Sequence, residues 1–210
     1  MSYLEKIEWL KQRLRYPLPG LEAQEHMAAR VLPMPPVVPK DARPSAVLCL
    51  LFPVNDELQL LLMKRTPDNT AHSGQVSFPG GKQDPHDTDL KSTALREAYE
   101  EVGIKPAEIE VLGALTPLYI PVSKFHVFPF VAFAKQRLNY ELSDDEVAHV
   151  IELPLPVLFH TDRKTTADVV SPAMPQVIRN VKAYKLEDGT IIWGATAMII
   201  SELEVIIGEY

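Results

Sequence analysis

Three glutamates gather in the stretch REAYEEVGI, where Glu97, Glu100 and Glu101 fall within five positions. At about 100° per residue, they would share roughly one third of the circumference of a helix. Their mutual repulsion costs roughly a few tenths of a kcal/mol per pair, and the negative end of the helix dipole adds to it. A divalent cation would reverse the sign of this interaction, because hard cations prefer carboxylate oxygens. A solvated, glutamate-rich helix face is the competing interpretation.

A glycine pair precedes this stretch. Gly80 and Gly81 stand between the short segment QVSF and a loop rich in aspartate. Glycine permits a close backbone approach and backbone angles that other residues avoid, so the Gly80 carbonyl could lie beside the carboxylates. Arg96 directly precedes Glu97 and could pair with a carboxylate and hold its orientation.

The residues around these carboxylates predict how a helix would position them. We expect the helix to begin with Asp87 or Thr88 as its N-cap and to end at Gly103. We expect the acidic face to be exposed to solvent, while the adjoining apolar face packs on the protein; that face holds Ala94, Leu95, Ala98 and Val102.

Hydrophobic patterns along the chain predict a mixture of strands and helices. Helices are expected at both ends, over residues 2–14 and 194–210, and strands at 45–52, 58–65, 75–78, 109–116 and 125–135. Residues 181–193 should form a hairpin that turns at EDG. Prolines in residues 31–44 favour an extended connector. The order of elements predicts an α+β domain with helices layered on a sheet.

Composition narrows the functional classes. The 210 residues carry a net charge of −7, with 46% hydrophobic and 23% charged residues, which opposes nucleic-acid binding. The single cysteine, Cys49, excludes an intramolecular disulfide and fits a reducing compartment. No apolar run reaches the roughly 20 residues of a membrane helix, and residues 1–15 lack the apolar core of a signal peptide. We therefore expect a cytoplasmic enzyme without a membrane partner.

The glycine pair and the acidic helix together resemble the Nudix box, over about residues 80–104. The box runs from glycine through a spacer to Arg-Glu, Glu-Glu and a closing glycine, and the matching residues here are Arg96, Glu97, Glu100, Glu101, Gly103 and Ile104. One position departs, because Thr88 stands where the family usually has a glutamate; Asp84, Asp87 and Asp89 are nearby substitutes. The resemblance implies an α/β/α sandwich with a mixed sheet over residues 44–210, preceded by an N-terminal helical arm over residues 1–43.

The resemblance also implies roles for the acidic residues. Glu97 and Glu101 would be direct ligands of Mg²⁺ or Mn²⁺, Glu100 would share a second metal ion, and the Gly80 carbonyl is a further candidate ligand. Arg96 would orient a carboxylate. Glu146, in SDDEVAHV, is either a remote ligand or general base, or a solvated loop acid.

The segment from Leu60 to Lys82 resembles the coenzyme A pyrophosphatase branch of the family through Arg65, His72, Gly74 and Gln75. This branch cleaves coenzyme A into 4′-phosphopantetheine and adenosine 3′,5′-bisphosphate. These four residues would bind the substrate, although Arg65 could form a surface ion pair and His72 a loop contact instead. ADP-ribose as the substrate and a non-catalytic nucleotide-binding module remain alternatives, and a homodimer remains open. Further candidate contacts are Lys64 and Lys124, for a 3′-phosphate, and His126, for a pocket wall.

Overall fold

A computed structural model of the protein describes residues 2–29, 37–68, 72–171 and 174–210. The helices are α1 (Tyr3–Arg13), α2 (Gly20–Glu25), α3 (Leu90–Val102), α4 (Leu155–Leu158) and α5 (Gly194–Gly208). The strands are β1 (Arg43–Val54), β2 (Glu57–Arg65), β3 (Val76–Ser77), β4 (Gly80–Lys82), β5 (Ile109–Ala114), β6 (Leu118–Ile120), β7 (Phe125–Ala134), β8 (Val147–Pro154), β9 (Lys164–Ser171), β10 (Met174–Lys185) and β11 (Ile191–Trp193).

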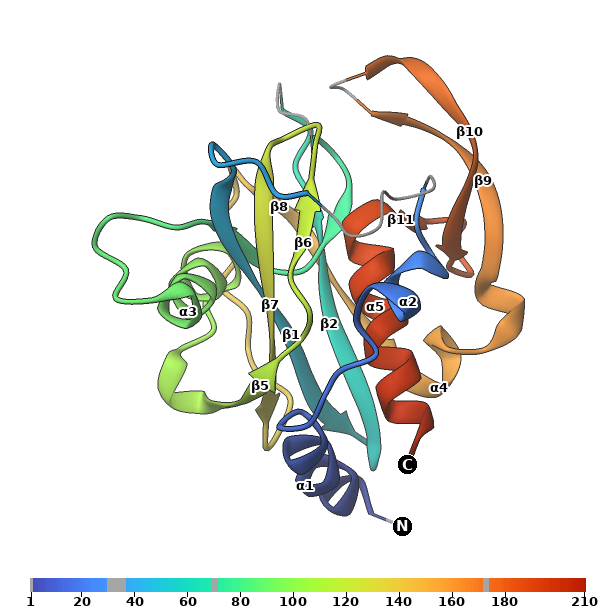
Figure 1. The fold of residues 1–210 in the computed structure, drawn as a ribbon. Helices are drawn as coiled ribbons and strands as arrows, with labels where there is room; N and C mark the ends of the chain where they lie inside the picture. The colour runs from blue at the N-terminus through green and yellow to red at the C-terminus, as the bar shows by residue number, and fades with distance from the viewer. Residues whose placement is uncertain (1, 30–36, 69–71, 172–173) are drawn as a thin grey trace.

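A mixed sheet of eight strands forms the centre of the protein (Figure 1). Its main path is β3-β2-β1-β7-β5, to which β4, β6 and β8 are added by pairing with β1, β7 and β2. The pair β1–β7 is parallel, from Arg43 opposite Phe125 to Leu51 opposite Phe133. The neighbouring pairs are antiparallel. The predicted α+β class and mixed sheet are confirmed.

Helices cover both faces of this sheet, with α3 on one side and α5, α1 and α2 on the other (Figure 1). Alternation along β1 builds a core on each face, because successive side chains of a strand point to opposite sides. On one face, Leu48 and Leu50 pack with Ala94, Ala98 and Val102 of α3. On the other face, Cys49 and Leu51 pack with apolar residues of α5 and α1, among them Ile199, Leu203, Ile7 and Leu10. The expected layers of helix, sheet and helix are therefore present.

The predicted strand pair β1–β2 closes through a tight turn. Asn55 and Asp56 both have positive φ, 49° and 64°, as a two-residue hairpin turn requires. The expected strands at 75–78, 109–116 and 125–135 correspond to β3, β5 and β7. Strands β4, β6, β8 and β9 were not expected, nor was the part of β10 before residue 181.

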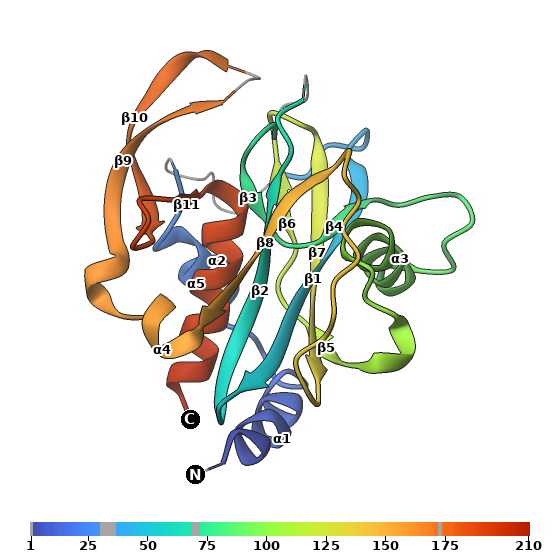
Figure 2. The same ribbon diagram turned by 180° about the vertical axis from the view of Figure 1, so that it is seen from behind.

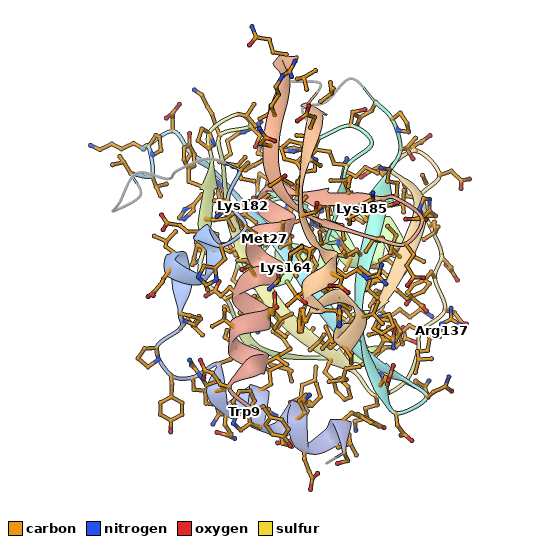
Figure 3. The ribbon with its side chains drawn as sticks, turned by 90° about the vertical axis from the view of Figure 1, so that its right-hand side faces the viewer. Trp9, Met27, Arg137, Lys164, Lys182 and Lys185 are labelled. Carbon is orange, nitrogen blue, oxygen red and sulfur yellow. The ribbon has the colours of Figure 1, made fainter. Side chains whose placement is uncertain are left out.

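The N-terminal segment packs against α5 and the residues that follow it. Trp9 of α1 packs on Tyr210 with ring centroids 5.1 Å apart, beside the C-terminal end of α5 (Figure 3). Farther along α5, the buried Glu202 accepts hydrogen bonds from the Gly20 backbone, 3.2 Å away, and from the Gln24 side chain, 2.9 Å away. Of the proline-rich connector expected at 31–44, residues 31–36 lie outside the described part of the chain. Helix α2 was not expected.

A second, three-stranded sheet, β11-β10-β9, stands beside α5 (Figure 2). The hairpin expected at 181–193 is confirmed, since β10 pairs with β11 from Ala183 opposite Trp193 to Lys185 opposite Ile191. Strand β11 leads directly into α5 at Gly194. Over the described residues, no helix is long and apolar enough to cross a membrane.

Candidate active site

The N-cap of helix α3 lies one residue after Thr88 and two after Asp87, the two expected caps. The side chain of Asp89 accepts a hydrogen bond from the Ser92 backbone, 2.7 Å away, so neither Asp87 nor Thr88 is the N-cap. All three residues are good helix caps, so sequence alone could not rank them. The end is as expected, because Gly103 closes the helix with φ of 75°.

Asp87 does not cap the helix, and its carboxylate accepts two hydrogen bonds from Arg96. The Asp87 carboxylate accepts from Nε and Nη2 of Arg96 at 2.9 and 3.0 Å, and from the Thr93 hydroxyl at 2.9 Å. The Arg96 guanidinium holds the pKa of this carboxyl well below its usual range. Arg96 also contacts Glu97 Oε1 at 2.9 Å and Glu100 Oε2 at 2.7 Å. Arg96 thus connects the loop before α3 to Glu97, and Asp87 is the residue of that loop that pairs with Arg96.

The carboxylates Glu97, Glu101 and Glu146 line one cavity of about 400 Å³. The first two come from α3, and Glu146 immediately precedes β8. The other polar lining residues are Ser45, Arg65, His72, Gln75, Ser77, Lys82 and Thr196. The apolar lining residues include Val47, Ile120, Val122, Phe125, Val127, Trp193 and Ile199. The cavity therefore has both acidic and apolar lining residues.

Glu101 is buried, and the expectation of a solvent-exposed acidic face is wrong for this residue. Its side chain is 2% exposed; Oε2 accepts from the Gly80 N–H at 2.8 Å, and Oε1 from Arg65 Nη1 at 3.3 Å. Burial raises the pKa of Glu101 to about 8, and the charges of Glu97 and Glu146 add to the rise. The Gly80 N–H and Arg65 oppose it without cancelling it. Helical spacing could not reveal this burial, which depends on the strand packed beside α3.

Burial also raises the pKa of Glu97, while Arg96 acts against the rise. Glu97 and Glu101 thus both have raised pKa values in one cavity. A divalent cation bound there would stabilise their ionised forms. Among the described residues, no three His, Cys, Asp or Glu side chains converge closely enough to hold a metal ion. The carboxylates are oxygen donors of the kind that Mg²⁺ takes, so the donor chemistry fits, and the side chains would have to draw together around an ion.

The two glycines make room for these carboxylates. Gly80 has φ of 153°, and a Cβ there would overlap the Ala46 carbonyl oxygen. A Cβ at Gly81 would lie 2.5 Å from the carboxylate carbon of Glu97. Gly80 is thus required by the backbone of the sheet, whereas Gly81 leaves space for a side chain of the site.

Other predicted residues divide between the cavity and its surroundings. His72 and Gln75 line the cavity and contact each other at 3.3 Å. Glu100 is 55% exposed and lies outside the lining, paired with Arg96. Gly74 is also outside; its φ of 63° serves the turn that links His72 to Gln75.

One cation of the cavity lining was not predicted. Lys82 lines the cavity, whereas Lys64 and Lys124 do not, and Lys124 pairs with Asp41 at 2.8 Å. His126 is likewise outside the lining, while its neighbours Phe125 and Val127 are within it. Lys82 directly follows Gly81 in the sequence, and this position could have predicted it as a residue of the site.

A family model and several relatives match this chain. Residues 42–171 match the NUDIX domain model. A relative from Yersinia pestis (strain Pestoides F), described as the uncharacterized Nudix hydrolase NudL, is 39% identical over 157 residues, which is 73% of this chain and 76% of the relative. The Yersinia pseudotuberculosis protein of the same description (serotype O:3, strain YPIII) matches with the same identity and coverage.

Two solved structures share the fold. A MutT/nudix family protein from Enterococcus faecalis aligns with a TM-score of 0.52 at 17% identity, over 99% of this chain and 75% of that one. The MutT protein from Methanosarcina mazei Go1 aligns with a TM-score of 0.51 at 18% identity, over 80% and 96%. At these identities the likeness concerns the fold alone, whereas the domain match and the NudL relatives establish the family. The chain belongs to the Nudix hydrolase family.

Proposed function

We propose that the protein is a metal-dependent pyrophosphohydrolase whose substrate is coenzyme A, cleaved by water into 4′-phosphopantetheine and adenosine 3′,5′-bisphosphate. The observation that carries the metal-dependent chemistry is the buried Glu101, which shares its cavity with Glu97 and Glu146. A buried carboxylate that shares a cavity with two further carboxylates is stabilised by positive charge, and a pyrophosphate brings more negative charge to the same place. A divalent cation answers both needs.

Glu97 and Glu101 are the proposed principal metal ligands, and the Gly80 carbonyl is a further proposed ligand. Bound Mg²⁺ or Mn²⁺ would neutralise the pyrophosphate and lower the pKa of the attacking water. Glu146 lines the same cavity from the segment before β8 and is our candidate to take the proton of that water. Arg96 positions Glu97 from outside the cavity. Glu100 is exposed, so it could join a second ion only after leaving Arg96.

We propose coenzyme A as the substrate because the segment from Arg65 to Gln75 resembles the coenzyme A pyrophosphatase branch of the family. Three of its four matching residues, Arg65, His72 and Gln75, line the cavity. The apolar lining residues, among them Trp193 and Phe125, suit an uncharged arm of a diphosphate substrate, such as pantetheine or a nucleobase. An ADP-ribose hydrolase would use the same carboxylates, and a binding module would hold a nucleotide without cleaving it.

A panel of substrates tests this proposal. kcat/KM is measured for coenzyme A, dephospho-coenzyme A and ADP-ribose with Mg²⁺ and with Mn²⁺, and the products are identified by mass. We expect coenzyme A to have the highest value. If ADP-ribose is cleaved best, the substrate assignment fails and the metal chemistry stands. If none is cleaved with either ion although a nucleotide binds, the binding module replaces the enzyme.

A further inference from the structure

Two cations line the cavity that holds the carboxylates, and they differ in their partners. Arg65 Nη1 lies 3.3 Å from Glu101 Oε1, and the Arg65 side chain is 20% exposed. Lys82 follows Gly81 in β4, and its ammonium group has no hydrogen-bond or ion-pair partner within the described ranges of the chain. One cation is therefore committed to a carboxylate and the other is available.

Two backbone hydrogen bonds fix the place of Arg65 in the sheet. Arg65 ends β2, and its N–H donates to the Gln75 carbonyl at 3.0 Å. The next residue, Thr66, donates its N–H to the Glu146 carbonyl at 2.9 Å. Arg65 is thus fixed between the segment that carries His72 and Gln75 and the segment that carries Glu146.

Glu101 is held at two points as a result. The Gly80 N–H contacts one carboxylate oxygen and Arg65 contacts the other, so the plane of the carboxylate is set by the strand and the guanidinium together. A carboxylate that binds a metal depends on such partners for its direction, and their loss typically costs about 10- to 100-fold in metal affinity or activity.

We propose that Arg65 is a positioning residue that orients Glu101 for metal binding, and that Lys82 is the cation that meets the phosphates of the substrate. The proposal rests on the proposed function, because it assigns parts within the same site. It differs from what the resemblance to the coenzyme A pyrophosphatase branch implies, namely that Arg65 binds the substrate. If Arg65 turned toward a phosphate in the metal-free protein, the buried Glu101 would lose its only ion-pair partner among the described residues. A bound metal ion would supply Glu101 with positive charge in place of Arg65. The role of Arg65 is therefore tested by measuring metal binding to the protein without substrate.

The test compares Arg65→Met, Lys82→Met and Arg137→Met. Arg137 is a matched control, because it lies on the surface, pairs with Glu152 at 2.9 Å and is outside the cavity (Figure 3). Mn²⁺ binding is measured by calorimetry without substrate, and kcat and KM for coenzyme A are measured at saturating Mn²⁺. We expect Arg65→Met to weaken Mn²⁺ binding about 10- to 100-fold and to lower kcat, with KM changed less than about 3-fold. Lys82→Met should raise KM about 10-fold and leave Mn²⁺ binding unchanged. Arg137→Met should change none of these quantities.

The outcomes distinguish a failure of the Arg65 role from a failure of the proposed function. Unchanged or tighter Mn²⁺ binding by Arg65→Met, together with a raised KM, would overturn the positioning role and return Arg65 to the substrate. A wild-type protein that binds no Mn²⁺ and cleaves no substrate would overturn the proposed function itself. Arg65→Lys is used if Arg65→Met does not fold. It keeps the charge and loses the planar fork, so weakened Mn²⁺ binding supports positioning, and binding like that of the wild type refutes it.

Discussion

Replacing Gly81 with alanine should inactivate the protein without unfolding it. The added Cβ would lie 2.5 Å from the carboxylate carbon of Glu97, whereas ordinary contacts begin near 3.4 Å. The Glu97 carboxylate must therefore move by about 1 Å, and a misplacement of that size can cost about 100-fold in rate. The backbone itself accepts alanine, because Gly81 does not have a positive φ and the atoms in conflict end a side chain.

The assay for Gly81→Ala is kcat at saturating substrate and metal, together with urea unfolding. We expect kcat to fall about 100-fold and the free energy of unfolding to change by less than about 1 kcal/mol. Gly208→Ala is the control, because nothing lies within 4 Å of its added Cβ, and it should change neither quantity. Gly80→Ala should instead destabilise the fold, because its Cβ overlaps backbone. If folded Gly81→Ala keeps near-normal kcat, the position of Glu97 does not matter and the reasoning fails.

Three further predictions follow from other contacts of the site and its support. Glu101→Gln should lower kcat about 100-fold or more. Since the folded pKa of Glu101 is about 8 and its ordinary value is 4.5, the folded state holds the extra proton. The metal-free wild type should therefore lose stability as pH rises from 4.5 to about 8, and Glu101→Gln should not, as thermal unfolding with a chelator will show. Asp87→Asn should lower kcat about 10- to 100-fold by loosening Arg96, whereas Thr88→Ala should have a mild effect; equal losses would contradict the assigned loop. Glu202→Ala should lower the free energy of unfolding by about 2–4 kcal/mol by leaving its buried donors unpaired. It should not change kcat at saturating substrate; a lost kcat in the folded variant would place the N-terminal segment in the site.

Local patterns predicted much of the fold. The apolar runs of β1 and β2, the turn at Asn55 and Asp56, and the closing Gly103 of α3 are all local signals, and the structure has them in place. Strand β8 was missed because it follows a loop rich in acids, and its pairing with β2 is remote in sequence.

The candidate site was predicted in its residue types but not in its burial. Glu97 and Glu101 could be found by helical spacing, yet only the packing of β4 against α3 shows that Glu101 is buried and Glu100 exposed. Likewise, the run from Asp84 to Asp89 offered several carboxylates, and the contact with Arg96 selects Asp87. Such choices depend on contacts between segments distant in sequence, which local patterns do not encode.

Cleavage of coenzyme A with and without metal tests the central claim most directly. Wild type and Glu101→Gln are each incubated with coenzyme A in Mg²⁺, in Mn²⁺ and in excess chelator, and the products are weighed by mass spectrometry. The account predicts 4′-phosphopantetheine and adenosine 3′,5′-bisphosphate from wild type with metal, and a loss of about 100-fold or more with chelator or with Glu101→Gln. Equal product from wild type in chelator, or from a folded Glu101→Gln variant with metal, would contradict it.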